Sequence, residues 1–258
     1  MGGLRLRIAR YRIEGKSVMG RLADGRLHPF PSDSLDVLTE FGTPLSLEGA
    51  VPLRPCRPEK IVGVGLNYRD HARERGKPIP AEPLIFLKPP TAALGPGAPI
   101  LLPRGAGRID HEAELAIVIG RTARDLPESS APEAILGYTC FNDVTAREIQ
   151  ERDGQFTRAK GFDTFAPFGP WIETDLDPSN LEVIARVNRS TRQASRTREL
   201  IFSPATLVAF ISRVMTLRPG DIIATGTPAG IGPLAPGDLV EIVIEGIGTL
   251  ANPVLGSF

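Results

Sequence analysis

The chain of 258 residues has only two cysteines, Cys56 and Cys140, and it carries no net charge. Two cysteines allow at most one disulfide, which excludes a disulfide-stapled secreted framework and favours a reducing, cytoplasmic location. Lys plus Arg equals Asp plus Glu at 30 each, so the overall charge offers no attraction for nucleic acid. We therefore interpret both cysteines as ordinary buried side chains and expect no nucleic-acid partner.

Long hydrophobic runs are also absent from the sequence. No apolar stretch approaches the roughly 20 residues that cross a bilayer. The first residues, MGGLRLR, lack the apolar segment of a signal peptide, so we expect neither a membrane anchor nor secretion. Asn, Gln and Lys are scarce while Arg is abundant, which a heat-adapted source and a GC-rich genome would explain equally well.

Glycine and proline are frequent, at 27 and 25 residues, and they separate short apolar runs instead of forming a linker. This texture is typical of a chain with many strands and tight connections. Three prolines within residues 51–58 predict an extended connector, because proline excludes regular helix. We therefore place a domain boundary near residue 55, between a small N-terminal domain (1–55) and a larger domain (56–258).

Predicted strands outnumber predicted helices along the chain. Helices are expected at 34–41, 67–76 and 204–215, the last with an apolar stripe and a Pro-Gly pair after it. This balance predicts an α+β, mostly β fold more readily than a doubly wound sheet. Strands are expected at 4–11, 60–66, 84–87, 115–119, 182–187, 197–202, 221–224, 239–244 and 248–254.

Three carboxylates, Glu112, Glu114 and Asp143, are the most informative polar residues. Glu112 and Glu114 precede the apolar run 115–119, which is typical of a buried strand. Because strand side chains alternate, both should project from one face, where two like charges need a compensating cation. With Asp143 as a third oxygen ligand, the set favours Mg²⁺, Mn²⁺ or Ca²⁺ over Zn²⁺ and leaves positions for a chelating substrate. The alternative is a pair of solvated residues on a half-exposed strand.

Two further groups could move a proton or bind an anion. His71 and Glu74 lie three residues apart on a predicted helix, so they face one side and could activate water or shuttle a proton. The alternative for this pair is an exposed ion pair. Lys160 lies among aromatic residues in the sequence and could bind a substrate carboxylate. The alternative is a surface lysine whose aliphatic chain packs on apolar residues while its ammonium stays in water. The Gly-rich loop, residues 225–232, lacks the ending of a phosphate loop, so its amides are expected to approach a small ligand.

Taken in order, these segments resemble the fumarylacetoacetate hydrolase family over about residues 58–255. The resemblance implies a mixed β-roll core, a small N-terminal α+β domain and a homodimer. It rests on the segments 65–68 with His71, 86–89, 111–115, 142–143, 221–228 and 240–252.

The same resemblance assigns roles to individual residues. It implies that Glu112, Glu114 and Asp143 bind Mg²⁺ or Mn²⁺, with Ca²⁺ able to substitute. His71 with Glu74 matches the family's catalytic dyad, and Lys160 matches its substrate-binding lysine, which we group with the catalytic residues. Arg147 lies close to Asp143 in the sequence, so we expect it to support that ligand. Gln150 and Thr227 match the family's polar substrate contacts, and we also expect Lys88, Arg147 and Gly226 to bind the substrate.

The activity implied by the resemblance is that of a metal-dependent enzyme in aromatic catabolism. It would act on a 2-oxo or 2-hydroxy-dienoate dicarboxylic acid through a metal-stabilised enolate. Residues 109–119 and 245–252 are similar to bacterial 2-hydroxyhepta-2,4-diene-1,7-dioate isomerases and the related decarboxylases of homoprotocatechuate breakdown. The alternatives are an acylpyruvate hydrolase or oxaloacetate decarboxylase, and a metal-dependent keto-acid-binding protein without turnover. Water activation by His71 and Glu74 favours the first alternative slightly.

Overall fold

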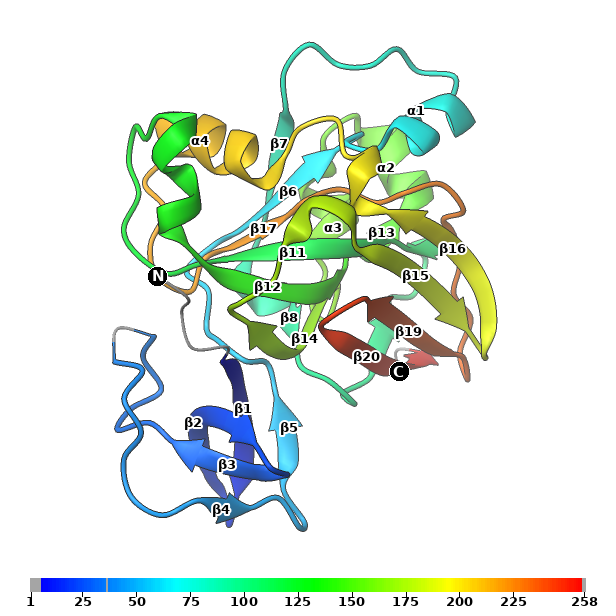
Figure 1. The fold of residues 1–258 in the computed structure, drawn as a ribbon. Helices are drawn as coiled ribbons and strands as arrows, with labels where there is room; N and C mark the ends of the chain where they lie inside the picture. Colours follow the sequence, from blue (N-terminus) through cyan, green and yellow to red (C-terminus); the bar gives the residue numbers. More distant parts are fainter. Residues whose placement is uncertain (1–5, 36, 257–258) are drawn as a thin grey trace.

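The computed structural model describes residues 6–35 and 37–256, in which strands predominate over helices (Figure 1). Within this part of the chain the strands form three sheets. The expected α+β, mostly β fold is confirmed. No helix of the described residues is long and apolar enough to cross a membrane.

The largest sheet of the described residues has 12 strands and begins in the N-terminal segment. Its strands are β1 (Arg7–Ile13), β2 (Lys16–Ala23), β3 (Arg26–Pro29), β4 (Leu45–Ser46), β5 (Val51–Leu53), β6 (Ile61–Gly65), β7 (Leu84–Lys88), β8 (Ala93–Leu94), β11 (Ala113–Ile119), β12 (Ile135–Asn142), β14 (Ala166–Glu173) and β17 (Ile222–Ala224). Neighbouring strands follow the order β4-β3-β2-β1-β14-β12-β11-β17-β6-β7, with β5 beside β1 and β8 beside β14.

Two smaller sheets and several short helices complete the described fold. The five-stranded sheet contains β9 (Ile100–Leu102), β15 (Glu182–Val187), β16 (Ser190–Arg196), β19 (Leu239–Ile244) and β20 (Gly248–Gly256). The three-stranded sheet contains β10 (Ile109–His111), β13 (Thr145–Ala146) and β18 (Gly232–Pro233). The helices are α1 (Arg69–Glu74), α2 (Arg147–Asp153), α3 (Phe156–Lys160) and α4 (Pro204–Val214), with 3-10 turns η1 (Pro90–Ala92), η2 (Glu128–Ala134), η3 (Pro178–Asn180) and η4 (Thr197–Glu199).

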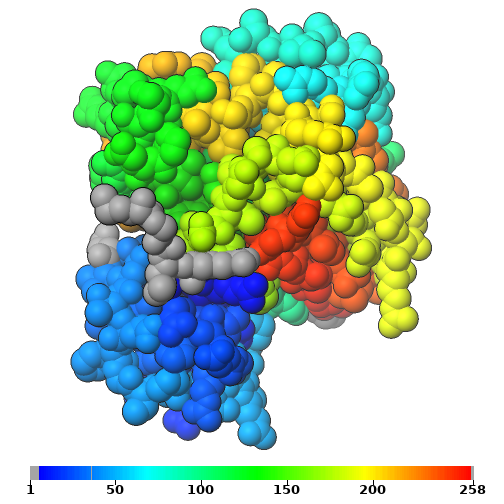
Figure 2. Space-filling view, in the orientation of Figure 1, coloured from blue at the N-terminus to red at the C-terminus, as the bar shows by residue number. Residues whose placement is uncertain are grey.

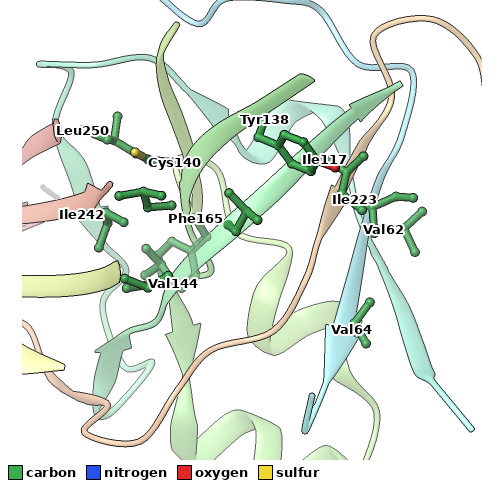
Figure 3. Close-up of a cluster of buried hydrophobic side chains, with 14 of the residues drawn as sticks. Val62, Val64, Ile117, Tyr138, Cys140, Val144, Phe165, Ile223, Ile242 and Leu250 are labelled. Carbon is green, nitrogen blue, oxygen red and sulfur yellow. The ribbon is translucent and has the colours of Figure 1, made fainter. Parts of the chain in front are cut away.

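The main hydrophobic core lies between the large sheet and the five-stranded sheet. Ile117 and Cys140 from the large sheet belong to the same cluster as Ile242 and Leu250 from the smaller one (Figure 3). Strand β11 is buried along its whole length, and its alternate residues enter two different clusters. A strand covered on both faces needs a continuous apolar run, which is why this segment could be predicted from sequence.

Helix α4 also follows from its sequence. The Ser203 Oγ accepts a hydrogen bond from the Thr206 amide at 3.1 Å, and Pro204 begins the helix where its missing N–H costs nothing. Leu207 and Ile211, two residues of the apolar stripe, are buried in the main core. The helix expected at 204–215 is therefore confirmed, as is the shorter helix expected within 67–76.

The strand expected at 197–202 is wrong, because this segment begins with the 3-10 turn η4. The Thr197 Oγ1 accepts from the Leu181 amide at 2.7 Å, and the Thr197 carbonyl accepts from the Leu200 amide at 3.0 Å. The bond between Thr197 and Leu200 closes a 3-10 turn, so the backbone here is not extended. The strand of this region is β16, directly before the turn, and its polar composition hides it from an apolar pattern.

The helix expected at 34–41 is also wrong, since residues 34–35 and 37–41 contain no helix, and residue 36 lies outside the described part. The Ser32 Oγ accepts from the Ser34 amide at 3.3 Å, a local bond that competes with helix formation. Leu35 and Leu38 instead pack on the core beneath the N-terminal strands.

The proline-rich segment 51–58 is only partly a connector. Residues 51–53 form β5, which pairs antiparallel with β1 and sets Pro52 opposite Tyr11. Proline is tolerated here because β5 hydrogen-bonds to a strand on one side only.

Strands β1 to β5 gather in one lobe, drawn in blue in Figure 2. The lobe is joined to the rest of the molecule through the sheet, because β1 pairs with β14 at Arg7–Glu173 and Ile8–Ile172. The domain boundary near residue 55 stays a prediction.

Candidate active site

Glu112, Glu114 and Asp143 meet where two neighbouring strands begin and end. Ala113 opens β11 and pairs with Asn142, the last residue of β12, so Glu112 and Asp143 emerge side by side. The Asp143 amide donates to the Glu112 carbonyl at 2.9 Å, and the Glu112 amide donates to Asn142 Oδ1 at 3.0 Å. One oxygen from each of the three carboxylates lies within 4.8 Å of the others.

Cationic side chains pair with two of these carboxylates. Arg147 Nη2 donates to Glu112 Oε1 at 2.5 Å, and Lys160 Nζ donates to Glu112 Oε2 at 2.9 Å. Lys160 also donates to Asp143 Oδ2 at 2.5 Å, while Lys88 donates to the other Asp143 oxygen. Burial alone would raise the pKa of Glu112, but Lys160 and Arg147 outweigh it and lower this pKa to about 2.

Glu114 differs from its two neighbours because, among the described residues, no cationic side chain lies within ion-pair distance of it. Its Oε2 accepts from the Gly226 amide at 2.8 Å. Burial, followed by the charges of Asp143 and Glu112, holds the pKa of Glu114 well above its ordinary value. Without a cation, the surroundings of Glu114 therefore favour its neutral, protonated form, and a bound cation would favour the ionised carboxylate.

The three carboxylates fit a hard divalent cation. They offer oxygen donors alone, and a carboxylate oxygen that accepts one hydrogen bond keeps a second lone pair for a metal. The alternative of solvated residues on a half-exposed strand is wrong, because Glu112 is 5% exposed and Glu114 is 2% exposed. The donor chemistry is that of Mg²⁺ or Mn²⁺.

The carboxylates lie on the wall of a pocket of about 310 Å³. Apolar side chains from β6 and β7, including Val64 and Phe86, form part of the wall. Phe156 from α3 meets the Phe86 ring edge-on, with 5.4 Å between the ring centroids. The sequence-predicted residues on this wall are His71, Glu112, Glu114, Asp143, Arg147, Gln150, Lys160 and Thr227.

His71 and Glu74 form the expected pair on α1. His71 Nδ1 lies 2.8 Å from Glu74 Oε2, and the His71 side chain is largely buried in the pocket wall. Glu74 Oε1 accepts from the Gly230 amide at 2.9 Å, which ties α1 to the Gly-rich loop. With its proton on Nδ1, the imidazole donates to Glu74 and leaves Nε2 able to accept a proton.

Two of the expected substrate-binding residues lie behind the carboxylates instead of on the pocket wall. Lys88 is 1% exposed and pairs with Asp143, and its ammonium also donates to the Val144 carbonyl at 3.3 Å. Gly226 contacts the site through its amide bond to Glu114. Both placements suit support of the carboxylates better than contact with a substrate.

Arg147 bonds three side chains of the site and holds Glu112 instead of Asp143, the carboxylate that it was expected to support. Its Nε donates to Asp110 Oδ2 at 3.0 Å and its Nη1 to Gln150 Oε1 at 2.5 Å, while Nη2 holds Glu112. Asp110 also accepts from Arg108 at 2.6 Å, so it acts as an anchor for two arginines. Because Arg147 donates to the Gln150 side-chain oxygen, the direction of the Gln150 amide nitrogen is fixed as well.

Sequence reasoning missed Gln193, a buried residue of β16. Its Oε1 accepts from the Ala113 amide at 2.9 Å, and its Nε2 donates to Thr227 Oγ1 and to the Pro228 carbonyl, both at 2.8 Å. Gln193 therefore fixes the Gly-rich loop against the start of β11. A single glutamine in a polar strand gives no sequence signal for this role.

Buried carboxylates beside a His–Glu pair, in a pocket of metabolite size, define a small-molecule enzyme. The family profile described as "Fumarylacetoacetate (FAA) hydrolase C-terminal" matches residues 60–255. The chain belongs to the fumarylacetoacetate hydrolase family, as its motifs predicted.

Several known proteins are similar over nearly the whole chain. An uncharacterized protein of Archaeoglobus fulgidus is 51% identical over 238 residues, covering 91% of this chain and 95% of the relative. The crystal structure of 2-hydroxyhepta-2,4-diene-1,7-dioate isomerase from Mycobacterium marinum is 44% identical with a TM-score of 0.91, covering 98% of this chain and 99% of that one.

A third similar structure shows a hydrolase. Maleylpyruvate hydrolase from Sphingobium sp. SYK-6, in complex with manganese (II) ion and pyruvate, is 30% identical with a TM-score of 0.82, covering 98% of this chain and 100% of that one. Together the comparisons support an enzyme of the isomerase or hydrolase type.

Proposed function

We propose that the protein is a metal-dependent isomerase or decarboxylase of a 2-oxo or 2-hydroxy-dienoate dicarboxylic acid, with 2-hydroxyhepta-2,4-diene-1,7-dioate as the first candidate substrate. The observation that carries this proposal is Glu114, a buried carboxylate without a cationic partner beside Glu112 and Asp143. The similar isomerase from Mycobacterium marinum and the manganese-pyruvate complex of the Sphingobium hydrolase support it.

Glu112, Glu114 and Asp143 would hold Mg²⁺ or Mn²⁺, which supplies positive charge for an enolate that forms from the substrate. Lys160 bonds Glu112 and Asp143 and so orients both carboxylates, and its ammonium lies 5.0 Å from the centre of the Phe86 ring. Because Lys160 also lines the pocket, it brings a fixed positive charge to an incoming carboxylate.

His71 would move the proton. Isomerisation removes a proton from one substrate carbon and returns it to another, which needs a base held in one orientation. Glu74 provides that orientation, since it bonds His71 with one oxygen and the Gly-rich loop with the other. In decarboxylation, His71 protonated from solvent would instead donate the proton that takes the place of CO₂ on the substrate carbon.

Two cationic residues at the end of α1 favour a dicarboxylic acid. Arg75 and Lys77 line the pocket while remaining exposed, and Glu151 lies on the same wall. An acid that places one carboxylate at the Glu112–Asp143 centre would bring its distal carboxylate toward these cations. A substrate without a distal carboxylate lacks this attraction.

The alternative of an acylpyruvate hydrolase has one specific observation in its favour. A His–Glu pair in a pocket can also activate water, and the Sphingobium relative is a hydrolase. Hydrolysis, isomerisation and decarboxylation differ in whether water reaches the bond that breaks.

A substrate panel tests the proposed function. We expect the dienoate to give the highest kcat/KM with Mg²⁺ or Mn²⁺, ahead of oxaloacetate and acetylpyruvate. Arg75→Gln should raise KM for the dienoate about tenfold, the value of one lost charge-assisted hydrogen bond, and leave acetylpyruvate unaffected. Arg73→Gln, an exposed arginine of the same helix outside the pocket wall, is the matched control.

Two results would contradict the proposed function. Fastest turnover of acetylpyruvate or oxaloacetate would identify the hydrolase or decarboxylase alternative. Tight oxalate binding without turnover of any panel member would identify a keto-acid-binding protein.

A further inference from the structure

A second groove, of about 920 Å³, lies where β1 and β5 meet the loop that follows β8. None of its lining residues belongs to the active-site pocket. Four arginines line it together with small residues of the segment 93–98. We call it the arginine groove, after Arg10, Arg12, Arg54 and Arg57.

The arginine groove has too little negative charge for its four cations. Among the described residues, Asp33 is the one carboxylate within ion-pair distance of them, at 3.6 Å from Arg10 Nη1 and 3.3 Å from Arg57 Nη2. The same Asp33 oxygen also accepts from Ser17 Oγ at 2.7 Å. One carboxylate is therefore shared by two of the four guanidinium groups, Arg10 and Arg57.

Two of these guanidinium groups are also short of hydrogen-bond acceptors. Arg10 is 5% exposed, and its Nε donates to the Arg54 carbonyl at 2.9 Å, but its buried Nη1 has no hydrogen-bond partner. Arg54 Nη1 donates to the Ala93 carbonyl at 3.1 Å, while its buried Nε has no partner. Unsatisfied buried donors are costly and rare in folded proteins.

The buried arginine of the active site, Arg147, donates hydrogen bonds to two carboxylates, which neither of these two arginines does in the described structure. There, Asp110 and Glu112 both bond Arg147 and raise its pKa in spite of burial. In the arginine groove, burial and the nearby charge of Arg57 lower the pKa of Arg10 and of Arg54. At Arg10, burial and the neighbouring arginines outweigh Asp33, so an added anion would stabilise the charged guanidinium.

We propose that the arginine groove binds a small multivalent oxyanion, of the phosphate-ester or polycarboxylate class. An anion with several oxygens can accept from more than one guanidinium, which forms forked hydrogen bonds to phosphate and carboxylate. The volume of the groove falls within the range of metabolite sites, and Arg10 supplies a buried cation beside it. A carboxylate from a second copy of the chain is the competing occupant.

Calorimetric titration of the full-length protein with inorganic phosphate and with tricarballylate, in Mg²⁺ at low ionic strength, tests this proposal. We expect saturable binding of at least one anion and a matching rise in melting temperature. The double variant Arg12→Gln/Arg57→Gln should bind at least about tenfold more weakly with unchanged turnover, because both side chains are exposed and lie outside the active site. Arg26→Gln, an exposed arginine of the same lobe outside the groove, is the control.

Three results would overturn the proposal. The first is the absence of saturable binding to the wild type, and the second is equal binding by wild type, double variant and control. The third is loss of a dimer in the double variant when the wild type binds neither anion, since the groove would then hold a carboxylate of a second copy.

Discussion

Replacing Glu114 with glutamine should abolish Mn²⁺ binding and lower kcat/KM by at least about 10³-fold. The amide keeps the shape of the side chain but removes the charge that has no cationic partner in the described structure. Stabilisation of a developing negative charge by a metal is worth several kcal/mol, and about 4 kcal/mol corresponds to a 10³-fold rate. Isothermal titration with Mn²⁺ and turnover of the dienoate measure both effects. Glu82→Gln, at an exposed position, should change neither.

The stability of the metal-free protein separates loss of the metal from loss of the fold. Because burial raises the pKa of Glu114 in the folded state, its contribution to stability is fully present below the ordinary carboxyl pKa and is lost as pH rises from there through the raised pKa of the folded state. The neutral amide avoids this loss. At pH 8 without metal, Glu114→Gln should therefore melt at or above the wild-type temperature, and Mn²⁺ should stabilise only the wild type. Metal-dependent turnover in the variant would contradict the assignment of Glu114 as a ligand.

Replacing His71 with alanine should lower kcat by about 10²–10⁴-fold, the usual contribution of a positioned general acid or base. Metal binding should persist, because His71 bonds Glu74 and no contact joins it to the three carboxylates in the described structure. Stopped-flow turnover and Mn²⁺ titration of the same sample distinguish the two effects. Arg73→Ala, which removes an exposed side chain from the same helix, should have nearly wild-type turnover.

The Glu74 side chain allows a finer test of the same pair. Glu74→Gln can still accept hydrogen bonds from His71 and Gly230, so it should lose less activity than His71→Ala. Near-normal turnover of His71→Ala would remove this histidine from the proton-transfer step.

The residues that were predicted correctly from sequence are those whose signal is local. The apolar run 115–119 marks β11, and the alternation of strand side chains brings Glu112 and Glu114 toward one centre. Residues 204–215 carry an apolar stripe and are followed by a Pro-Gly pair, so α4 was predicted almost to its ends.

The parts that could not be predicted depend on long-range contacts. The anchoring of the Gly-rich loop by Gln193 joins residues more than thirty positions apart, and β16 shows no apolar pattern. Lys88 resembles a substrate-binding residue in its motif, yet the pairing of β7 with β6 places it beneath Asp143. The helix predicted at 34–41 does not form, because the Ser32 side-chain bond and the packing of Leu35 and Leu38 on the core outweigh a weak helix preference.

Diffraction at the manganese absorption edge, from crystals grown or soaked in Mn²⁺, tests the central claim most directly. One anomalous peak is expected within coordinating distance of Glu112, Glu114 and Asp143, facing the pocket that His71 lines. A fully soaked crystal with no peak at these carboxylates, or with a peak held by other residues, would contradict the account.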